Sequence, residues 1–198
     1  MNLEAEVSRF KSWAAGEAQD YGEWETTYQE WHGLYVAAKA ALSKPALDDV
    51  EMELLLYALA RDNELEFIRD MLEEFPANGF RLAAAALTYA DPDARWQIAD
   101  FLGTLDTPEA RGLLRRFVED SDEYVRRRAL LAAQKCDPIF AEEIARSWLN
   151  SPHEYSRLAA LDILHELGSR YLTQALEQLR EDPYVYVRER VAKIESEV

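Results

Sequence analysis

The stretch that decides the fold is DSDEYVRRRAL, residues 120–130, because related stretches recur along the chain. Its first arginine belongs to a series with a constant spacing of 31 residues: Arg95, Arg126, Arg157 and Arg188. A tyrosine stands two positions before three of them, at Tyr124, Tyr155 and Tyr186. A fixed period of this length is the sequence signature of stacked, repeated supersecondary units.

Each repeated unit predicts two helices. In the unit that begins at Ser121, Val125, Ala129 and Ala132 fall at helical spacing, and Pro138 then separates a second apolar face. We expect helices to begin where Ser or Asp stands beside Pro or Asp, at 91–92, 121–122, 151–152 and 182–183. One such pair cannot bury its apolar face alone, so the sequence predicts an all-α solenoid of about six antiparallel helix pairs.

The repeat is not equally clear along the chain. It is clearest over residues 91–198 and can be followed back to residue 46, with the segment 80–90 as an additional helix. Residues 1–45 do not match it, and we expect them to form N-terminal capping helices, since terminal repeats are commonly atypical. The sequence therefore predicts a single continuous domain.

The repeated unit resembles HEAT repeats, in particular the short bacterial variety also seen in phycobilin-lyase-like proteins. The residues that carry the resemblance are 120–126 with Ala129 and Leu130, and 182–188 with Val191. The resemblance implies a protein-binding scaffold, although a few HEAT-like proteins are enzymes or enzyme subunits. It also implies that Arg95, Arg126, Arg157 and Arg188 form a structural ladder with aspartates in neighbouring turns, such as Asp91, Asp120 and Asp182. Direct ligand contact by these arginines is the alternative.

Composition narrows the choice of partners. The chain has 198 residues, with 22 Lys and Arg against 38 Asp and Glu, a formal net charge of −16. That balance disfavours nucleic acid and anionic membranes, both of which attract basic proteins, and favours a basic protein partner or simple solubility. A lone cysteine, Cys136, an acidic N-terminal segment and the lack of any long apolar run predict a cytoplasmic protein.

The acidic charge is concentrated in residues 46–90, which hold three basic and ten acidic side chains. We take the glutamates of this segment and two nearby tryptophans as candidate partner-binding residues: Glu51, Glu53, Glu64, Glu66, Glu73, Glu74, Trp24 and Trp31. The acids alternatively form a solvated face. The tryptophans belong to a series of Tyr21, Trp24, Tyr28, Trp31 and Tyr35, four of which fall on one predicted helical stripe, so packing of the cap is the alternative for them.

A local group of basic side chains interrupts the acidic chain: Arg111, Arg115, Arg116, Arg127 and Arg128. It is a candidate site for phosphate or an acidic peptide. Acids lie among these arginines, so intramolecular pairing on a solvated surface is the alternative.

Catalytic motifs are weak. His32, His153 and His165 are far apart and have no metal-ligand spacing, and the chain has no Gly-rich phosphate loop. We expect Cys136 to be a buried cysteine at a helix end. A DNA glycosylase site could be built on Trp96, Asp100 and Trp148, but the negative net charge of the chain disfavours binding to DNA. We therefore predict a non-enzymatic protein-interaction module with no cofactor, metal or catalytic residue. An immunity or inhibitor protein that neutralises a toxin or enzyme domain is the first alternative, and a HEAT-like lyase or DNA glycosylase is the second.

Overall fold

The computed structural model describes residues 2–16 and 24–197, and over these residues it contains helices and no strand. Residues Met1–Thr104 and Leu105–Val198 form two compact units. The prediction of an all-α fold is confirmed. Thirteen helices occur in the described ranges, one more than the roughly twelve expected from the repeat. The additional one is the single turn α2.

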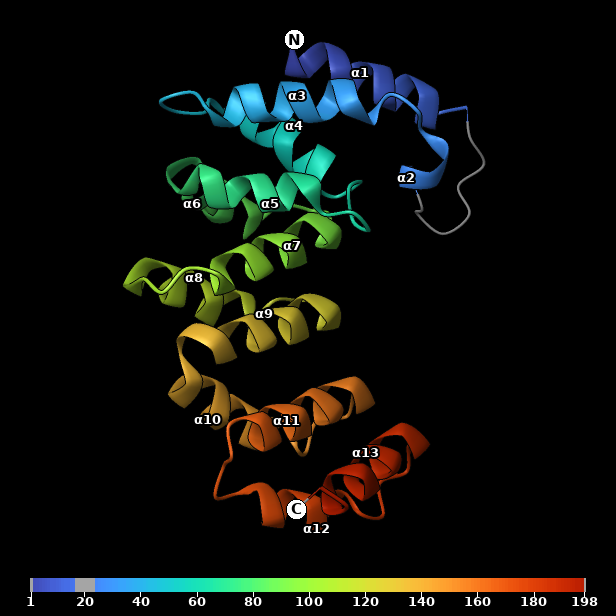
Figure 1. The fold of residues 1–198 in the computed structure, drawn as a ribbon, viewed down its shortest axis with the longest axis vertical. Helices are drawn as coiled ribbons and strands as arrows, with labels where there is room; N and C mark the ends of the chain where they lie inside the picture. Colours follow the sequence, from blue (N-terminus) through green and yellow to red (C-terminus); the bar gives the residue numbers. More distant parts are fainter. Residues whose placement is uncertain (1, 17–23, 198) are drawn as a thin grey trace. The chain divides into compact units, whose positions relative to one another are not determined.

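The first unit contains seven helices (Figure 1). They are α1 (Leu3–Ala14), α2 (Trp24–Thr27), α3 (Trp31–Leu42), α4 (Asp49–Leu59), α5 (Phe67–Glu74), α6 (Pro76–Ala86) and α7 (Pro92–Gly103). Helix α3 packs on α1, α4 and α5, and α7 packs on α4, α5 and α6. The segment expected as an additional helix between the first helices and the clear repeats is α6, which begins at Pro76, four residues earlier than predicted.

Buried amides fasten the later helices of this unit to the earlier ones. Asn78, which is 3% exposed, donates from Nδ2 to the carbonyls of Leu42 and Lys44 at 2.8 and 2.9 Å. Gln97 donates to the carbonyl of Leu59 at 2.6 Å. These carbonyls lie at or near the C-terminal ends of α3 and α4, where no helical N–H is available for them. The side chains of α6 and α7 thereby bind main-chain carbonyls at these helix ends, of which that of Leu59 also accepts from the N–H of Asp62 at 3.2 Å.

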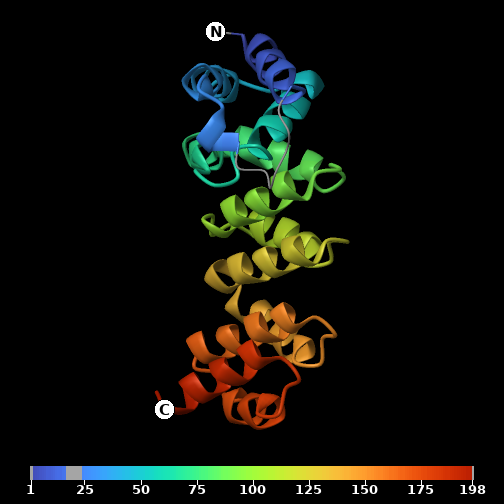
Figure 2. The same ribbon diagram turned by 90° about the vertical axis from the view of Figure 1, so that its right-hand side faces the viewer.

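The second unit contains six helices: α8 (Pro108–Phe117), α9 (Glu123–Cys136), α10 (Pro138–Trp148), α11 (Glu154–Glu166), α12 (Leu172–Leu179) and α13 (Val185–Glu195). Helix α11 packs between α9 and α13, while α10 contacts α9 and α11, and α12 contacts α11 and α13. Figure 2 shows this unit from a second side, with the two rows of helices. The arrangement is the two-layered stack that the repeat predicts.

The 31-residue period is visible in where helices begin. Helices α7, α9, α11 and α13 start at Pro92, Glu123, Glu154 and Val185. Asp91 and Asp122 cap the first two, as predicted. The predicted starts at 151–152 and 182–183 are wrong by two residues, because Ser151 and Asp182 form turns before the helix. Ser151 accepts from the N–H of His153, and Asp182 accepts from the N–H of Tyr184.

Candidate functional site

The four periodic arginines hold the turns that precede their helices. In each case Nη1 donates to the main-chain carbonyl six positions earlier: Arg95 to Tyr89, Arg126 to Asp120, Arg157 to Ser151 and Arg188 to Asp182, at 2.8, 2.8, 2.7 and 2.5 Å. A guanidinium suits this task because it carries several donors and stays charged when it is partly buried. In these hydrogen bonds the four arginines bind the main chain of the protein itself.

One of these arginines also forms an ion pair with a residue of another turn. Arg157 forms a two-pronged pair with Asp182, at 2.7 and 2.8 Å. The hydrogen bonds from Arg157 lower the pKa of Asp182, and the same contact raises the pKa of Arg157. The residue that stands in the place of Asp182 one repeat earlier is Ser151, which has no charge to offer Arg126. Asp91 pairs with Arg61 at 2.6 Å, a residue outside the periodic series.

The six candidate glutamates occupy three different places in the first unit. Glu51 completes a capping box with Asp48 at the start of α4 and pairs with Lys44. It lies at the rim of an open groove of about 440 Å³, formed by α1, α3 and α4. Glu53 is exposed on α4, and Glu74 pairs with Lys39 at 2.7 Å. Glu66 and Glu73 share Arg69, and Glu64 stands two positions before Glu66 in the loop that leads to α5, so the structure divides the group that the sequence suggested.

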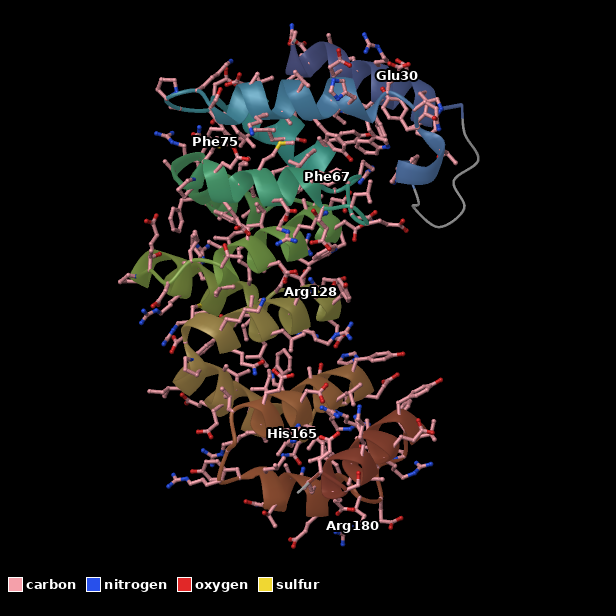
Figure 3. The ribbon with its side chains drawn as sticks, viewed as in Figure 1. Glu30, Phe67, Phe75, Arg128, His165 and Arg180 are labelled. Atoms are coloured by element: carbon pink, nitrogen blue, oxygen red, sulfur yellow. The ribbon has the colours of Figure 1, made fainter. Side chains whose placement is uncertain are left out.

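The segment Glu64–Phe67, which we call the acidic–apolar loop, joins α4 to α5 (Figure 3 labels Phe67). Leu65 and Phe67 are 50% and 47% exposed, and the glutamates alternate with them. Glu66 has φ of 54°, the left-handed region that non-glycine residues rarely adopt. Sequence reasoning missed Leu65 and Phe67, although the alternation of acidic and apolar residues is visible in the sequence.

The buried carboxylate of Asp62 holds the acidic–apolar loop in place. Asp62 is fully buried and accepts from the hydroxyl of Tyr35 at 2.8 Å and from the N–H of Ile68 at 2.7 Å. The second contact satisfies one of the free N–H groups in the first turn of α5, where the N-cap residue Glu66 offers no side-chain hydrogen bond. The ring of Phe67 lies edge-on to that of Tyr35, with centroids 5.3 Å apart. The exposed loop is therefore held by specific contacts.

The predicted aromatic stripe is not one helix face. Helix α2 ends at Thr27 and α3 begins at Trp31, so the stripe is interrupted at residues 28–30. Tyr28 and Trp31 are 4% and 7% exposed and surround Phe10, with ring centroids 4.8 and 5.3 Å from it. Trp24 is half-buried. Tyr21 lies outside the described residues. These rings pack α1 against α3, and the ring of Trp31 stacks on Tyr35.

Four of the five arginines of the predicted basic patch, all but Arg116, have acidic or aromatic partners described in the second unit. Arg111 pairs with Asp106 at 2.5 Å and Arg115 with Asp137 at 2.6 Å. Arg127 lies 3.7 Å from the carboxylate of Glu123, and Arg128 lies over the ring of Tyr124 (Figure 3 labels Arg128). These contacts agree with the second interpretation of the patch, in which its arginines pair with other residues of the same chain.

No metal-binding group of three or more His, Cys, Asp or Glu side chains occurs in the described part of the chain. His165 lies 3.6 Å from Glu197. Cys136 is a buried free thiol, and burial raises its pKa. Burial also raises the pKa of Tyr89 to about 12, with Glu53 and Asp91 acting in the same direction. A thiol or phenol with a raised pKa is a poorer nucleophile at neutral pH.

Comparison with known proteins gives a family for part of the chain. Residues 79–139 match the family model described as HEAT repeats, which agrees with the resemblance seen in the sequence. No curated protein matches the chain. Within the described residues, no helix is long and apolar enough to cross a membrane. The match covers α7, α8 and α9 completely, and these helices include the first two of the periodic arginines.

Proposed function

We propose that this chain is a protein-binding module without enzymatic activity, because residues 79–139 match HEAT repeats and such repeats are generally protein-interaction scaffolds. Its partner is a protein with a basic surface, which docks on the acidic–apolar loop and the adjoining face of α5. The observation that carries this proposal is the exposure of Leu65 and Phe67, which alternate with Glu64 and Glu66.

Apolar anchors at the centre of an interface with charges around them are the usual arrangement of binding hot spots. The strained backbone of Glu66 supports the same reading, since left-handed non-glycine residues cluster at functional sites and cost roughly 1–3 kcal/mol. The apolar anchors are held in place before a partner binds, because Asp62, together with Tyr35, holds the first turn of α5. A rigid anchor loses little conformational entropy when a partner binds.

The charge around these anchors is negative. Arg69 is shared by Glu66, Asp70 and Glu73, at 2.8, 3.0 and 4.0 Å. One guanidinium cannot neutralise three carboxylates, and Glu64 adds a further exposed acid. Complementary fields raise association rates above about 10⁵–10⁶ M⁻¹s⁻¹ at low salt, so a basic partner gains in speed of capture.

The proposed surface keeps three of the six glutamates suggested by the sequence: Glu64, Glu66 and Glu73. Glu51 and Glu74 have lysine partners of their own, and Glu53 belongs to α4. Trp31 acts indirectly, because it is buried and its ring stacks on Tyr35, which in turn supports Phe67. Trp24 lies further from the loop than Trp31 does, because its ring reaches that of Trp31 through Phe10. It remains a secondary candidate.

A narrower form of the proposal is that the partner is a toxin or enzyme domain that this chain inhibits. The net charge of −16 supports it, since basic enzymes that act on nucleic acid are complementary to such a protein. Addition of the chain to the purified partner tests this form directly. Loss of the partner's activity at a one-to-one ratio is the expected result, and binding without inhibition leaves only the general form.

The general proposal is tested by affinity purification from the native host, followed by stopped-flow kinetics with the purified partner. We expect the association rate to fall steeply as salt increases, while Phe67→Ser or Leu65→Ser raises the dissociation rate about tenfold or more. The matched control is Ile139→Ser, since Ile139 is an equally apolar residue, 82% exposed, in the second unit. An association rate independent of salt, or unchanged dissociation of both loop variants, contradicts the proposal.

A further inference from the structure

Two arginines of the second unit share the ring of Tyr171. The guanidinium carbon of Arg146, on α10, lies 3.8 Å from the centroid of that ring. The guanidinium carbon of Arg170, in the turn before α12, lies 4.8 Å from the same centroid, and its Nη2 donates to the tyrosine hydroxyl at 2.6 Å. In Figure 1 the connection from α11 to α12 lies on the same side of the unit as α10. Two positive charges are thus held beside one aromatic ring.

Neither guanidinium has a carboxylate partner. Among the residues that the structure describes, Arg146 and Arg170 form no ion pair, and both side chains are exposed. Arg180, at the other end of α12, does have such a partner, since it pairs with Glu195 at 2.5 Å (Figure 3 labels Arg180). Two like charges that share one ring repel each other. An anion that contacts both guanidinium groups would remove this repulsion.

The preceding repeat shows what a guanidinium at this position binds. Arg115 and Phe140 stand 31 positions before Arg146 and Tyr171. The guanidinium carbon of Arg115 lies 4.5 Å from the centroid of the Phe140 ring, so the stacked arginine occurs in the structure of both repeats. Arg115 also pairs with Asp137 at 2.6 Å. In the preceding repeat, the protein therefore supplies the anion itself.

The second site lacks this carboxylate. The residue 31 positions after Asp137 is Gly168, which has no side chain. A Cβ at Gly168 would meet nothing within 4 Å among the described residues, so that side of the turn is open. The residue 31 positions after Ile139 is Arg170. Compared with the preceding repeat, the site has lost one negative charge and gained one positive charge.

We infer that Arg146, Arg170 and Tyr171 bind a phosphate group of a ligand. A phosphate monoester carries a charge of about −1.5 to −2 at neutral pH, which matches two guanidinium ions, and its oxygens accept from their paired N–H donors. The hydroxyl of Tyr171 accepts from Arg170 and keeps its own hydrogen to donate. The net charge of −16 disfavours a long polyanion such as nucleic acid. The site belongs to the second unit alone, so it does not depend on the surface proposed around α5.

The direct test is a titration of the full chain with N-acetyl-O-phosphoserine amide at constant ionic strength, followed by NMR of the arginine Nε–Hε and tyrosine ring signals. We expect the signals of Arg146, Arg170 and Tyr171 to shift with saturation at one site. N-acetyl-serine amide should cause no shift, and N-acetyl-aspartate amide, with a single charge, should bind about fivefold more weakly or worse. Equal binding of the phosphorylated and the carboxylate probe, or shifts spread over other arginines, would overturn the inference.

A titration with inorganic phosphate distinguishes two sources of the group. Tighter binding of the phosphoserine probe than of inorganic phosphate supports a phosphorylated side chain of a partner protein. Equal binding of the two supports a free phosphorylated molecule. Either result agrees with a phosphate site, whereas the absence of saturable shifts with both probes contradicts it.

Substitution of the two arginines tests whether the charges act together. Arg146→Gln and Arg170→Gln should each weaken binding of the phosphoserine probe about tenfold or more. The matched control is Arg115→Gln, which removes the same charge at the equivalent position of the preceding repeat, where Asp137 already neutralises it. It should bind as the unchanged protein does. The substituted side chains are exposed, so the fold should tolerate all three changes. Unchanged binding by Arg146→Gln and Arg170→Gln, or an equal loss in Arg115→Gln, excludes the site.

Discussion

Arg157 and Asp182 lie 25 positions apart in the sequence and are joined by two parallel hydrogen bonds, from Nε at 2.7 Å and from Nη2 at 2.8 Å. Their side chains are 8% and 3% exposed. The same arginine donates to the carbonyl of Ser151, and the same aspartate accepts from the N–H of Tyr184. One pair of side chains therefore joins the turn before α11 to the turn before α13.

Replacement of Arg157 by Ala should destabilise the protein by about 3 kcal/mol, because it leaves the buried carboxylate of Asp182 without its cation. Arg126→Ala is the matched control, since Arg126 occupies the same place in the preceding repeat but donates to two carbonyls, at 2.8 and 3.1 Å. We expect about 1 kcal/mol for it. Urea unfolding of both variants measures the difference, and equal losses would contradict the importance assigned to the ion pair.

Acid should weaken the contribution of Asp182. Its pKa is lowered in the folded protein, so the stabilisation is complete above the unfolded value of about 3.9 and is lost as the pH falls through the folded value. The stability difference between the unchanged protein and Asp182→Asn should be constant from neutral pH to about pH 5 and should shrink below about pH 4. Urea unfolding over this pH range measures it. A difference that persists in strong acid would show that the pair does not depend on the charge of Asp182.

Gly79→Ala should destabilise the protein by about 2 kcal/mol, although alanine favours helices more than glycine does. A Cβ at Gly79 would lie 2.4 Å from Cζ of Phe101, whose ring is fully buried and has little room to move. Gly112 in α8 is the control, because a Cβ there meets nothing within 4 Å. Gly112→Ala should stabilise by roughly 0.5–1 kcal/mol. Thermal and urea unfolding of the two variants should therefore change in opposite directions.

Glu66→Gly should leave the protein at least as stable as before, with a gain of up to about 1 kcal/mol, because glycine adopts positive φ without steric cost. Loss of the 2.8 Å contact with Arg69 offsets part of the gain, since the two side chains are only 22% and 23% exposed. Glu66→Val should cost about 1–2 kcal/mol, because a β-branched residue is strained at φ of 54°. If both variants were equally stable, the left-handed conformation would carry no strain.

The repeat made much of the fold predictable from the sequence. Residues that recur every 31 positions face the same environment in successive units, so Ala129, Ala160 and Val191 could be assigned to the core from their spacing alone. Helix starts at 151–152 and 182–183 were misplaced by two residues, since a capping side chain and a turn side chain look alike in sequence. The aromatic residues of the N-terminal region were assigned to one helix for a related reason, because periodicity does not reveal a break between α2 and α3.

The candidate sites show where sequence reasoning stopped. Charge density pointed to residues 46–90, but charge alone does not tell which carboxylates are neutralised. In the structure Lys39 pairs with Glu74 and Lys44 pairs with Glu51. Leu65 and Phe67 are distinguished by the exposure of their side chains, which composition does not reveal.

By itself, the sequence determined the helical class, the period of the repeat and the residues that recur in each turn, because these depend on local spacing and on which side chains cap or break helices. The tertiary structure decided which side chains meet. Arg157 pairs with Asp182 whereas Asp91 pairs with Arg61, and the guanidinium of Arg127 lies over the rings of both Tyr124 and Tyr155. Such contacts depend on the distance between helices that are far apart in the chain, and a periodic sequence fixes equivalent positions without fixing what occupies the space between them.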